Sequence, residues 1–169
     1  MNNKAKTYLF FGLSGAGKTT LASFFSEQIN PDQPLVLLDG DRFRRGVSAD
    51  LGYSLEDRKE NIRRAAETAK LLNQQGYTVF ASFICPLKES RDIFKSIVGD
   101  EHYVGVFVDC SIETCKQRDP KGLYKKALSG EIQKFTGITS PFEQPDGSED
   151  VLVLKNEELQ DQETSLKQF

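Results

Sequence analysis

The sequence predicts an α/β fold in which a doubly wound parallel sheet is covered by helices on both faces. Three features of the 169 residues carry this prediction: short apolar runs recur, they end at acidic or glycine residues, and helical patterns lie between them. Strands that alternate with helices in this way favour a parallel sheet that is buried on both faces. With 38% hydrophobic and 28% charged residues the chain is globular, and its length predicts a single domain over residues 1–169.

Five runs have the composition of strands, because they are rich in aromatic and β-branched residues. In chain order they are residues 7–11, 34–38, 77–83, 103–108 and a shorter run at 151–154. Ligands of such sheets bind at the carboxyl ends of the strands. We therefore expect the segments that follow the runs to meet at one edge of the sheet; they contain Asp39, Asp41, the turn at 82–86 and Asp109.

Two segments between these runs show the spacing of amphipathic helices. One is residues 21–29, and the other is residues 55–75, which Gly76 is placed to end. The second helix carries an apolar stripe of Ile62, Ala65, Ala66, Ala69 and Leu72. Residues 118–144 are rich in Lys and Gly with little strand character, so we expect a mobile lid there. Residues 156–169 predict a weak polar helix without chemistry.

The most informative run is residues 12–20, Gly-Leu-Ser-Gly-Ala-Gly-Lys-Thr-Thr, which has the spacing of a phosphate-binding loop. Its glycines let backbone amides turn toward phosphate oxygens, while Lys18 adds charge for the β- and γ-phosphates and the Thr19 hydroxyl is a ligand for Mg²⁺. The alternative is a glycine-rich turn without a ligand, but the strand before the run and the helix after it favour a nucleotide site. We expect ATP to be held by Gly12, Ser14, Gly15, Ala16, Gly17, Lys18, Thr19 and Thr20.

A second group of polar residues predicts an acceptor for the phosphate. Asp41 is the candidate that orients or deprotonates an acceptor hydroxyl, and Asp39 is a contact to Mg²⁺-bound water or a structural residue. A plain turn with a helix N-cap is the alternative interpretation of this Asp-Gly-Asp run. Four arginines and one amide side chain near Asp41 indicate an anionic acceptor: Arg42, Arg44, Arg45, Arg58 and Asn61. Arg58 and Asn61 are one helical turn apart, on a helix face away from the Ile62 stripe. For Lys59, Glu60 and Arg64 we favour a solvated helix face.

Composition excludes several other functions. The net charge of −3 argues against a dedicated nucleic-acid binder. The first apolar run is too short for a signal peptide or a membrane span.

The three cysteines, Cys85, Cys110 and Cys115, lack metal-site spacing and predict reduced thiols in a cytoplasmic protein, the last two in the core. His102 has no partner nearby in sequence and is expected to be an ordinary surface or hydrogen-bonded histidine.

Several motifs in one order along the chain resemble those of the adenylylsulfate kinase family. They read LDGD at 38–41, DLGYS at 50–54, EDRKENIRR at 56–64, ASFI at 81–84, RDPKGLYKKA at 118–127, GEIQKFTGI at 130–138 and PFEQP at 141–145. The resemblance implies a P-loop NTPase-type fold with a lid segment. It also implies transfer of the γ-phosphate of MgATP to the 3′-hydroxyl of adenosine 5′-phosphosulfate (APS), giving 3′-phosphoadenosine 5′-phosphosulfate (PAPS) and ADP.

The resemblance also implies a role for each site residue. Asp41 would orient or deprotonate the 3′-hydroxyl, and Lys121 would relieve charge on the transferring phosphate. Tyr53 and Phe135 would sandwich the substrate adenine. Arg44, Arg58 and Asn61 would hold the phosphosulfate and its neighbouring groups. Ile84 and Cys85 would line the pocket with their backbone, and Arg118 would help to hold ATP. Residue chemistry agrees, because guanidinium groups suit phosphate and sulfate oxygens and aromatic faces suit a purine.

Three positions depart from the family pattern. Arg42 stands where the family usually has Asn, which bears on APS binding, and Tyr53 replaces a more usual Phe. Cys85 stands where many members have a serine, so a phosphoserine intermediate at this position is excluded and direct in-line transfer is the simpler mechanism.

Two other functions compete with APS kinase activity. One is a kinase of the same build with another anionic nucleotide or sugar-linked acceptor, for which Arg42 would be the specificity change. The other is a non-catalytic nucleotide-sensing domain, such as the kinase-like regulatory domain appended to some ATP sulfurylases. Intact Lys18, Thr19 and Asp41 argue against the second. The resemblance further implies a homodimer that works beside ATP sulfurylase. The net charge and the short first apolar run predict no nucleic-acid or membrane partner.

Overall fold

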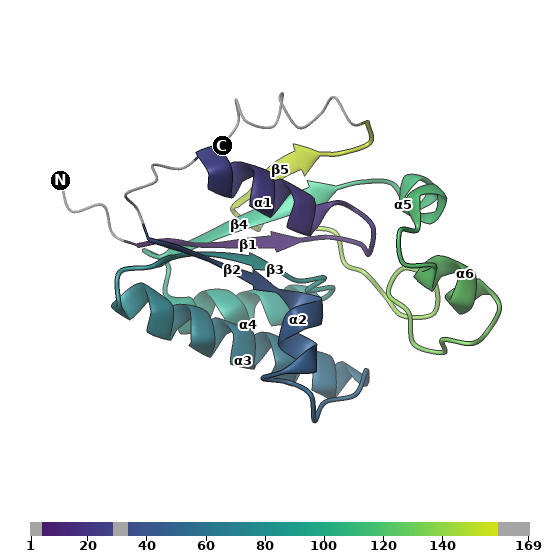
Figure 1. Cartoon of the computed structure of the whole chain (residues 1–169), viewed down its shortest axis with the longest axis horizontal. Coiled ribbons are helices and arrows are strands. Elements are labelled where there is room, and N and C mark those ends of the chain that lie inside the picture. Colours follow the sequence, from purple (N-terminus) through teal and green to yellow (C-terminus); the bar gives the residue numbers. More distant parts are fainter. Residues whose placement is uncertain (1–4, 29–33, 159–169) are drawn as a thin grey trace.

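A parallel sheet forms the centre of the molecule (Figure 1). The structure is a computed structural model that describes residues 5–28 and 34–158. Within them the sheet has five strands in the order β2-β3-β1-β4-β5, and every pairing is parallel. The strands are β1 (Thr7–Phe11), β2 (Leu35–Asp39), β3 (Thr78–Ser82), β4 (Tyr103–Asp109) and β5 (Val151–Lys155). All five predicted strands are confirmed.

Helices cover both faces of this sheet. In Figure 1, α1 (Lys18–Gln28) lies on one face, and α3 (Leu55–Gln74) and α4 (Lys88–Val98) lie side by side on the other. The shorter helices α2 (Gly40–Arg45), α5 (Ile112–Arg118) and α6 (Leu123–Leu128) lie toward the carboxyl ends of the strands. The predicted doubly wound fold is therefore confirmed.

The alternation of side chains along β1 explains the two layers of core. Leu9 and Phe11 face the helix pair α3–α4, whereas Phe10, between them, faces α1. β1 pairs with a parallel strand at each edge, with Leu9 opposite Ala81 on one side and Gly105 on the other, and helices cover both faces, so that four of its five residues are buried. Apart from Thr7 and the hydroxyl of Tyr8, the central strand is apolar, as its sequence indicates.

The long helix begins and ends where its sequence predicts. Ser54 accepts a hydrogen bond from the Asp57 amide at 3.0 Å, and the Asp57 carboxylate accepts one from the Ser54 amide at 3.2 Å, which makes a capping box. At the other end Gly76 has a φ of 86°, and the Tyr77 amide donates back to the Leu72 carbonyl. The predicted stop at Gly76 is confirmed.

Other predictions needed correction at the local level. The Asp-Gly-Asp run is an N-cap, because Asp39 accepts a hydrogen bond from the Arg42 amide at 3.0 Å, and it begins α2 rather than a plain turn. The first helix begins three residues earlier than position 21, at Lys18. The expected polar helix at 156–169 falls mostly outside the described residues, and its first residues, 156–158, are not helical.

The residues expected to be structural are so. Cys110 and Cys115 are buried in the core under α1, and the Nδ1 atom of His102 lies 2.6 Å from the Ala5 carbonyl. In the part of the chain that the structure describes, no helix combines the length and apolarity that a membrane crossing requires.

Candidate active site

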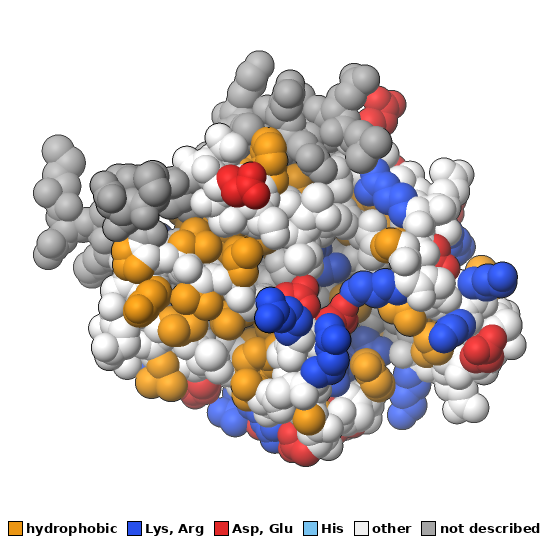
Figure 2. All heavy atoms as spheres, in the orientation of Figure 1, with side chains coloured by type: hydrophobic (Ala, Val, Ile, Leu, Met, Phe, Trp, Pro, Cys, Tyr) orange, Lys and Arg blue, Asp and Glu red, His pale blue; other side chains and the backbone are white. Residues whose placement is uncertain are grey.

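A cavity of about 910 Å³ opens at the carboxyl edge of the sheet, as the strand directions predict. Figure 2 shows Lys and Arg side chains, with acidic ones among them, gathered between α2 and the α5–α6 part of the molecule. The cavity brings the predicted site residues together. Its lining includes Ser14, Gly15, Gly17, Lys18, Thr19, Thr20, Asp39, Asp41, Arg44, Tyr53, Arg58, Asn61, Ile84, Cys85, Arg118, Lys121 and Phe135.

Two predicted residues, Gly12 and Ala16, are buried in the phosphate loop behind this lining. Gly12 has a φ of 151°, and a Cβ atom there would lie 2.6 Å from the Val108 carbonyl oxygen, so no other residue fits. Gly15 and Gly17 also have positive φ, at 77° and 94°. The glycines therefore shape the loop as the sequence predicts.

Side chains distant in sequence hold this loop from outside. The Tyr124 hydroxyl donates a hydrogen bond to the Ser14 carbonyl at 2.8 Å, and the buried Asn156 amide donates one to the Ala16 carbonyl at 2.7 Å. Asn156 follows β5 and also lines the cavity. The expectation that the segment from residue 156 contributes nothing to the site is thus wrong for Asn156. No local pattern reveals such a contact.

Lys18 lies at the start of α1 and faces the cavity. Its ammonium donates to the Leu13 carbonyl at 2.7 Å. Burial lowers the pKa of Lys18 to about 8, although nearby Cys115 and Asp41 partly oppose this effect. An anionic phosphate next to the ammonium would stabilise its charged form and raise this pKa, so the site suits an anion.

Oxygen atoms suited to Mg²⁺ lie beside Lys18. The Thr19 hydroxyl donates to the Asp39 carboxylate at 2.9 Å. Burial alone would raise the pKa of Asp39, but hydrogen bonds from the Arg42 amide and Thr19 outweigh it and lower that pKa. Among residues 5–28 and 34–158 no group of three or more His, Cys, Asp or Glu could hold a metal. Hard oxygen donors in small number fit Mg²⁺, which keeps waters and phosphates as its other ligands.

The candidate base and the lid lysine meet directly. Asp41 lies in the first turn of α2, and its carboxylate forms an ion pair with the Lys121 ammonium. Both side chains are more than half exposed and line the cavity. Asp41, assigned to the acceptor hydroxyl, and Lys121, assigned to the transferring phosphate, therefore lie in contact within the cavity.

The arginines of the acceptor side are ordered by their surroundings. The Arg44 guanidinium lies 4.6 Å from the centroid of the Tyr53 ring and donates to the Gly52 carbonyl at 2.8 Å. Arg58 donates to the Tyr53 carbonyl, to the Thr136 hydroxyl and to the Lys134 carbonyl. It thereby connects α3 to the predicted lid. Tyr53 nevertheless remains 60% exposed and lines the cavity.

Two further lining residues have unusual surroundings. Asn61 is buried, and its Oδ1 atom has no hydrogen-bond partner among the described residues. Ile62 lines the cavity too, so Asn61 does not lie away from the apolar stripe as expected but next to it. Phe135 is nearly buried, with its ring 4.9 Å from that of Tyr124 in an edge-to-face arrangement. An unpaired buried oxygen is costly and fits a ligand that donates to it.

The simpler interpretation, a solvated helix face with ion pairs, agrees with the contacts of Lys59, Glu60 and Arg64. Glu60 forms ion pairs with Arg63 and Arg64, and hydrogen bonds from both lower the pKa of Glu60 to about 2. Lys59 pairs with Glu89 at 2.6 Å on the surface. Arg118 lines the cavity and donates to the Glu157 carbonyl at 2.8 Å.

Comparisons with known proteins identify the family. The family model described as "Adenylylsulphate kinase" matches residues 4–153. The chain belongs to the adenylylsulfate kinase family. The predicted membership is thus confirmed, and relatives agree with it. The probable adenylyl-sulfate kinase of Halalkalibacterium halodurans is 48% identical over 155 residues, which are 89% of this chain and 74% of that protein.

Two further adenylylsulfate kinases extend the comparison. The adenylyl-sulfate kinase of Bacillus licheniformis is 47% identical over 151 residues, 89% of this chain and 77% of that protein. The Mycobacterium tuberculosis APS kinase CysC, solved in complex with AMPPNP and APS, superimposes with a TM-score of 0.88 at 37% identity. The superposition covers 98% of this chain and 97% of that one. The P-loop kinase fold of the family is therefore present over almost the whole chain.

Proposed function

We propose that this chain transfers the γ-phosphate of MgATP to the 3′-hydroxyl of APS, producing PAPS and ADP in sulfate activation. The observation that carries the proposal is one cavity that joins an intact phosphate loop to Asp41 and the acceptor residues. The family relationship supports the choice of acceptor, because the solved M. tuberculosis APS kinase binds APS.

Transfer requires positioning and charge stabilisation more than covalent chemistry from the protein. We assign Lys18 and the loop amides to the β- and γ-phosphates of ATP, with Arg118 as a further contact. Thr19 would hold Mg²⁺, with Asp39 bonded to Thr19 beside it, and the ion would neutralise charge on the phosphates. Asp41 would orient the 3′-hydroxyl and accept its proton, while Lys121 would move from Asp41 toward the oxygens of the transferred group.

The acceptor side suits a phosphosulfate attached to a purine nucleoside. Arg44 and Arg58 offer guanidinium donors, and Asn61 offers an amide at the floor of the cavity. Tyr53 and Phe135 present aromatic faces to a base, and Ile84 and Cys85 contribute backbone atoms of the wall. Arg42 is exposed and is not among the lining residues, so its departure from the family pattern does not argue for another acceptor.

The larger organisation is also a proposal. We assign residues 1–169 to one kinase domain in which residues 118–144 act as a lid over the nucleotides. We further propose a cytoplasmic homodimer that works beside ATP sulfurylase, with no nucleic-acid or membrane partner. Light scattering of the purified protein would give the mass of the assembly, and a monomer at working concentration would contradict the dimer.

The direct test is to incubate the purified protein with MgATP and APS and to follow ADP and PAPS. Other nucleotides and gluconate serve as parallel acceptors, and Lys18→Ala is the control for contaminating kinases. We expect PAPS from micromolar APS. If another acceptor were phosphorylated and APS were inert, the kinase would stand and the acceptor assignment would fall. Nucleotide binding without any transfer would favour the sensing domain.

A further inference from the structure

A buried arginine outside the set of site residues contacts the acceptor wall, by which we mean the cavity-lining residues Ile84, Cys85 and Pro86. Arg91, on α4, is only 1% exposed and is among the largest fully buried side chains of the described residues. A guanidinium in such a place requires a charged partner and bonds for its remaining donors. The partners of Arg91 therefore indicate what it does.

Glu149 neutralises this charge. Its carboxylate, 8% exposed, accepts two parallel hydrogen bonds from Nε and Nη2 of Arg91, both at 2.7 Å. The central carbon of the guanidinium, Cζ, lies over the Phe11 ring, 4.9 Å from its centroid. This pair fixes the plane of the guanidinium, because the bidentate geometry allows one orientation only. The third nitrogen, Nη1, is thereby aimed at the main chain.

Nη1 donates to two carbonyl oxygens from different segments. One belongs to Cys85 at 3.3 Å, and the other belongs to Glu143 at 3.0 Å. Cys85 lines the cavity and has a φ of 41°, the only left-handed value among the described non-glycine residues. Such a backbone persists only where its surroundings hold it in place. Arg91 is one of the groups that do so.

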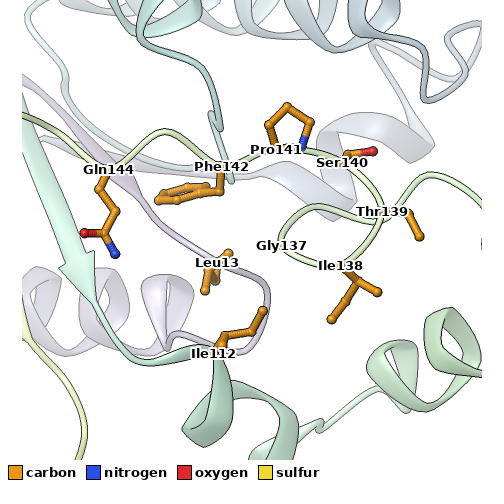
Figure 3. Close-up of a pocket in the computed structure, with 9 residues that line it drawn as sticks. All are labelled: Leu13, Ile112, Gly137, Ile138, Thr139, Ser140, Pro141, Phe142 and Gln144. Atoms are coloured by element: carbon orange, nitrogen blue, oxygen red, sulfur yellow. The ribbon is translucent and has the colours of Figure 1, made fainter.

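The same segment holds the other side of the turn. The Glu143 amide donates to the Pro86 carbonyl at 2.8 Å, and the Glu143 carboxylate accepts from the Lys88 amide at 2.6 Å. The neighbouring Phe142 stacks on Phe107 of β4 with ring centroids 6.1 Å apart. Phe142 also lines a second hollow together with Leu13 (Figure 3). This hollow has a volume of about 500 Å³, and none of the predicted site residues lines it.

We infer that Arg91, oriented by Glu149, is a positioning residue for the acceptor. It fixes the backbone of Cys85 and so the wall formed by Ile84, Cys85 and Pro86. The inference rests on the proposed function, since that wall is assigned to APS. The loop that would bind ATP meets this wall at one hydrogen bond, from the Gly12 amide to the Ile84 carbonyl, and is also held by Tyr124 and Asn156. We therefore expect Arg91 to affect APS binding more than ATP binding.

The test replaces the ion pair by apolar side chains of similar size. Arg91→Met alone leaves Glu149 buried and unpaired, and we expect a large fall in Tm. The double variant Arg91→Met/Glu149→Leu removes that penalty and should regain much of the Tm. Because it still lacks the donor to Cys85, its KM for APS should stay raised by about tenfold or more, with the Kd for ATP within about twofold of wild type.

Matched controls separate positioning from general damage. Lys95→Met on the same helix removes an exposed charge and should change neither constant, since the Lys95–Asp100 pair lies on the surface. Arg91→Lys keeps the charge but cannot bond to Glu149 and Cys85 with the same planar fork, so it should rescue Tm more than the KM for APS.

Two results would overturn the inference. One is a double variant with regained Tm and a wild-type KM for APS. The other, if the double variant stays unstable, is an equal loss of APS and ATP binding in Arg91→Lys measured well below its Tm. Failure of the proposed function looks different, because wild-type protein would then form no PAPS.

Discussion

The two halves of the cavity are built in contrasting ways. The donor half, which would bind ATP as the phosphate donor, is one short loop whose glycines turn main-chain amides inward. Tyr124 and Asn156 hold this loop by hydrogen bonds to its carbonyl groups. The acceptor half consists mainly of long charged and aromatic side chains from α2, the loop before α3, α3 itself and the 118–135 segment, beside the backbone wall of the β3–α4 turn. A site made of backbone tolerates few substitutions within the loop, whereas a site made of side chains is adjustable one residue at a time.

The halves also touch each other. The Gly12 amide donates to the Ile84 carbonyl at 3.3 Å, so the loop that would bind ATP contacts the wall assigned to APS. If the contrast holds, substitutions should divide into those that affect one nucleotide and those that affect the transfer itself.

The largest effect is expected for Lys18→Ala. Removal of the main positive charge at the β- and γ-phosphates should lower kcat/KM by about a thousandfold or more. A coupled ADP assay with APS in excess gives the value, and circular dichroism checks the fold. Substantial remaining activity would remove Lys18 from the donor site and break the comparison at its strongest point.

Asp41→Asn should come next. An asparagine keeps the shape but cannot accept the proton of the acceptor hydroxyl, so kcat should fall by about 100-fold to 10,000-fold. The Kd for ATP, measured by calorimetry, should change little. A variant with normal kcat and only a raised KM for APS would make Asp41 a binding group and leave the base unassigned.

Asn156→Ala should have a smaller effect that is confined to the donor half. The Ala16 carbonyl loses its buried partner, and the KM for ATP should rise by about fivefold to tenfold while the KM for APS stays unchanged. Tyr124→Phe, which removes the hydroxyl bonded to Ser14, is the parallel variant. Equal increases of both KM values would show that the loop and the acceptor wall move together.

The smallest effect concerns protons. Because the pKa of Lys18 is lowered to about 8 in the free protein, the ammonium is partly deprotonated at pH 8.5. ATP favours the charged form and raises this pKa, so binding should take up a fraction of a proton there and weaken as the pH rises above 8. Calorimetry in two buffers of different ionisation enthalpy measures the uptake. Proton release at pH 8.5 would contradict the assignment.

The sequence was informative where structure depends on neighbours along the chain. The phosphate loop, the start of the long helix at Leu55 and its stop at Gly76 are short patterns, and the structure confirms them. All five strands were also visible, because each is a short apolar run with turn residues around it. The short helix α2 was not predicted as a helix, since six residues carry too little periodicity to distinguish it from a turn.

Contacts between distant segments were not predictable from one sequence. Asn156 lies 140 residues from its partner Ala16, and Arg91 lies 58 residues from Glu149. Nothing near either residue indicates such a partner, and a buried arginine looks in the sequence like any surface arginine of an amphipathic helix. The ion pair of Asp41 with Lys121 likewise joins residues 80 positions apart and arises only in the folded chain.

Cys85 has a consequence for inhibitors. A thiol beside the acceptor invites covalent drug design, yet Cys85 is buried, and burial raises the pKa of its thiol to about 12. Electrophilic warheads react with thiolates, which are very scarce at neutral pH when the pKa is that high. We therefore expect an acrylamide or chloroacetamide carried by an APS analogue to react only slowly with Cys85. Compounds against this kinase should instead gain selectivity from reversible contacts with the exposed Tyr53 ring.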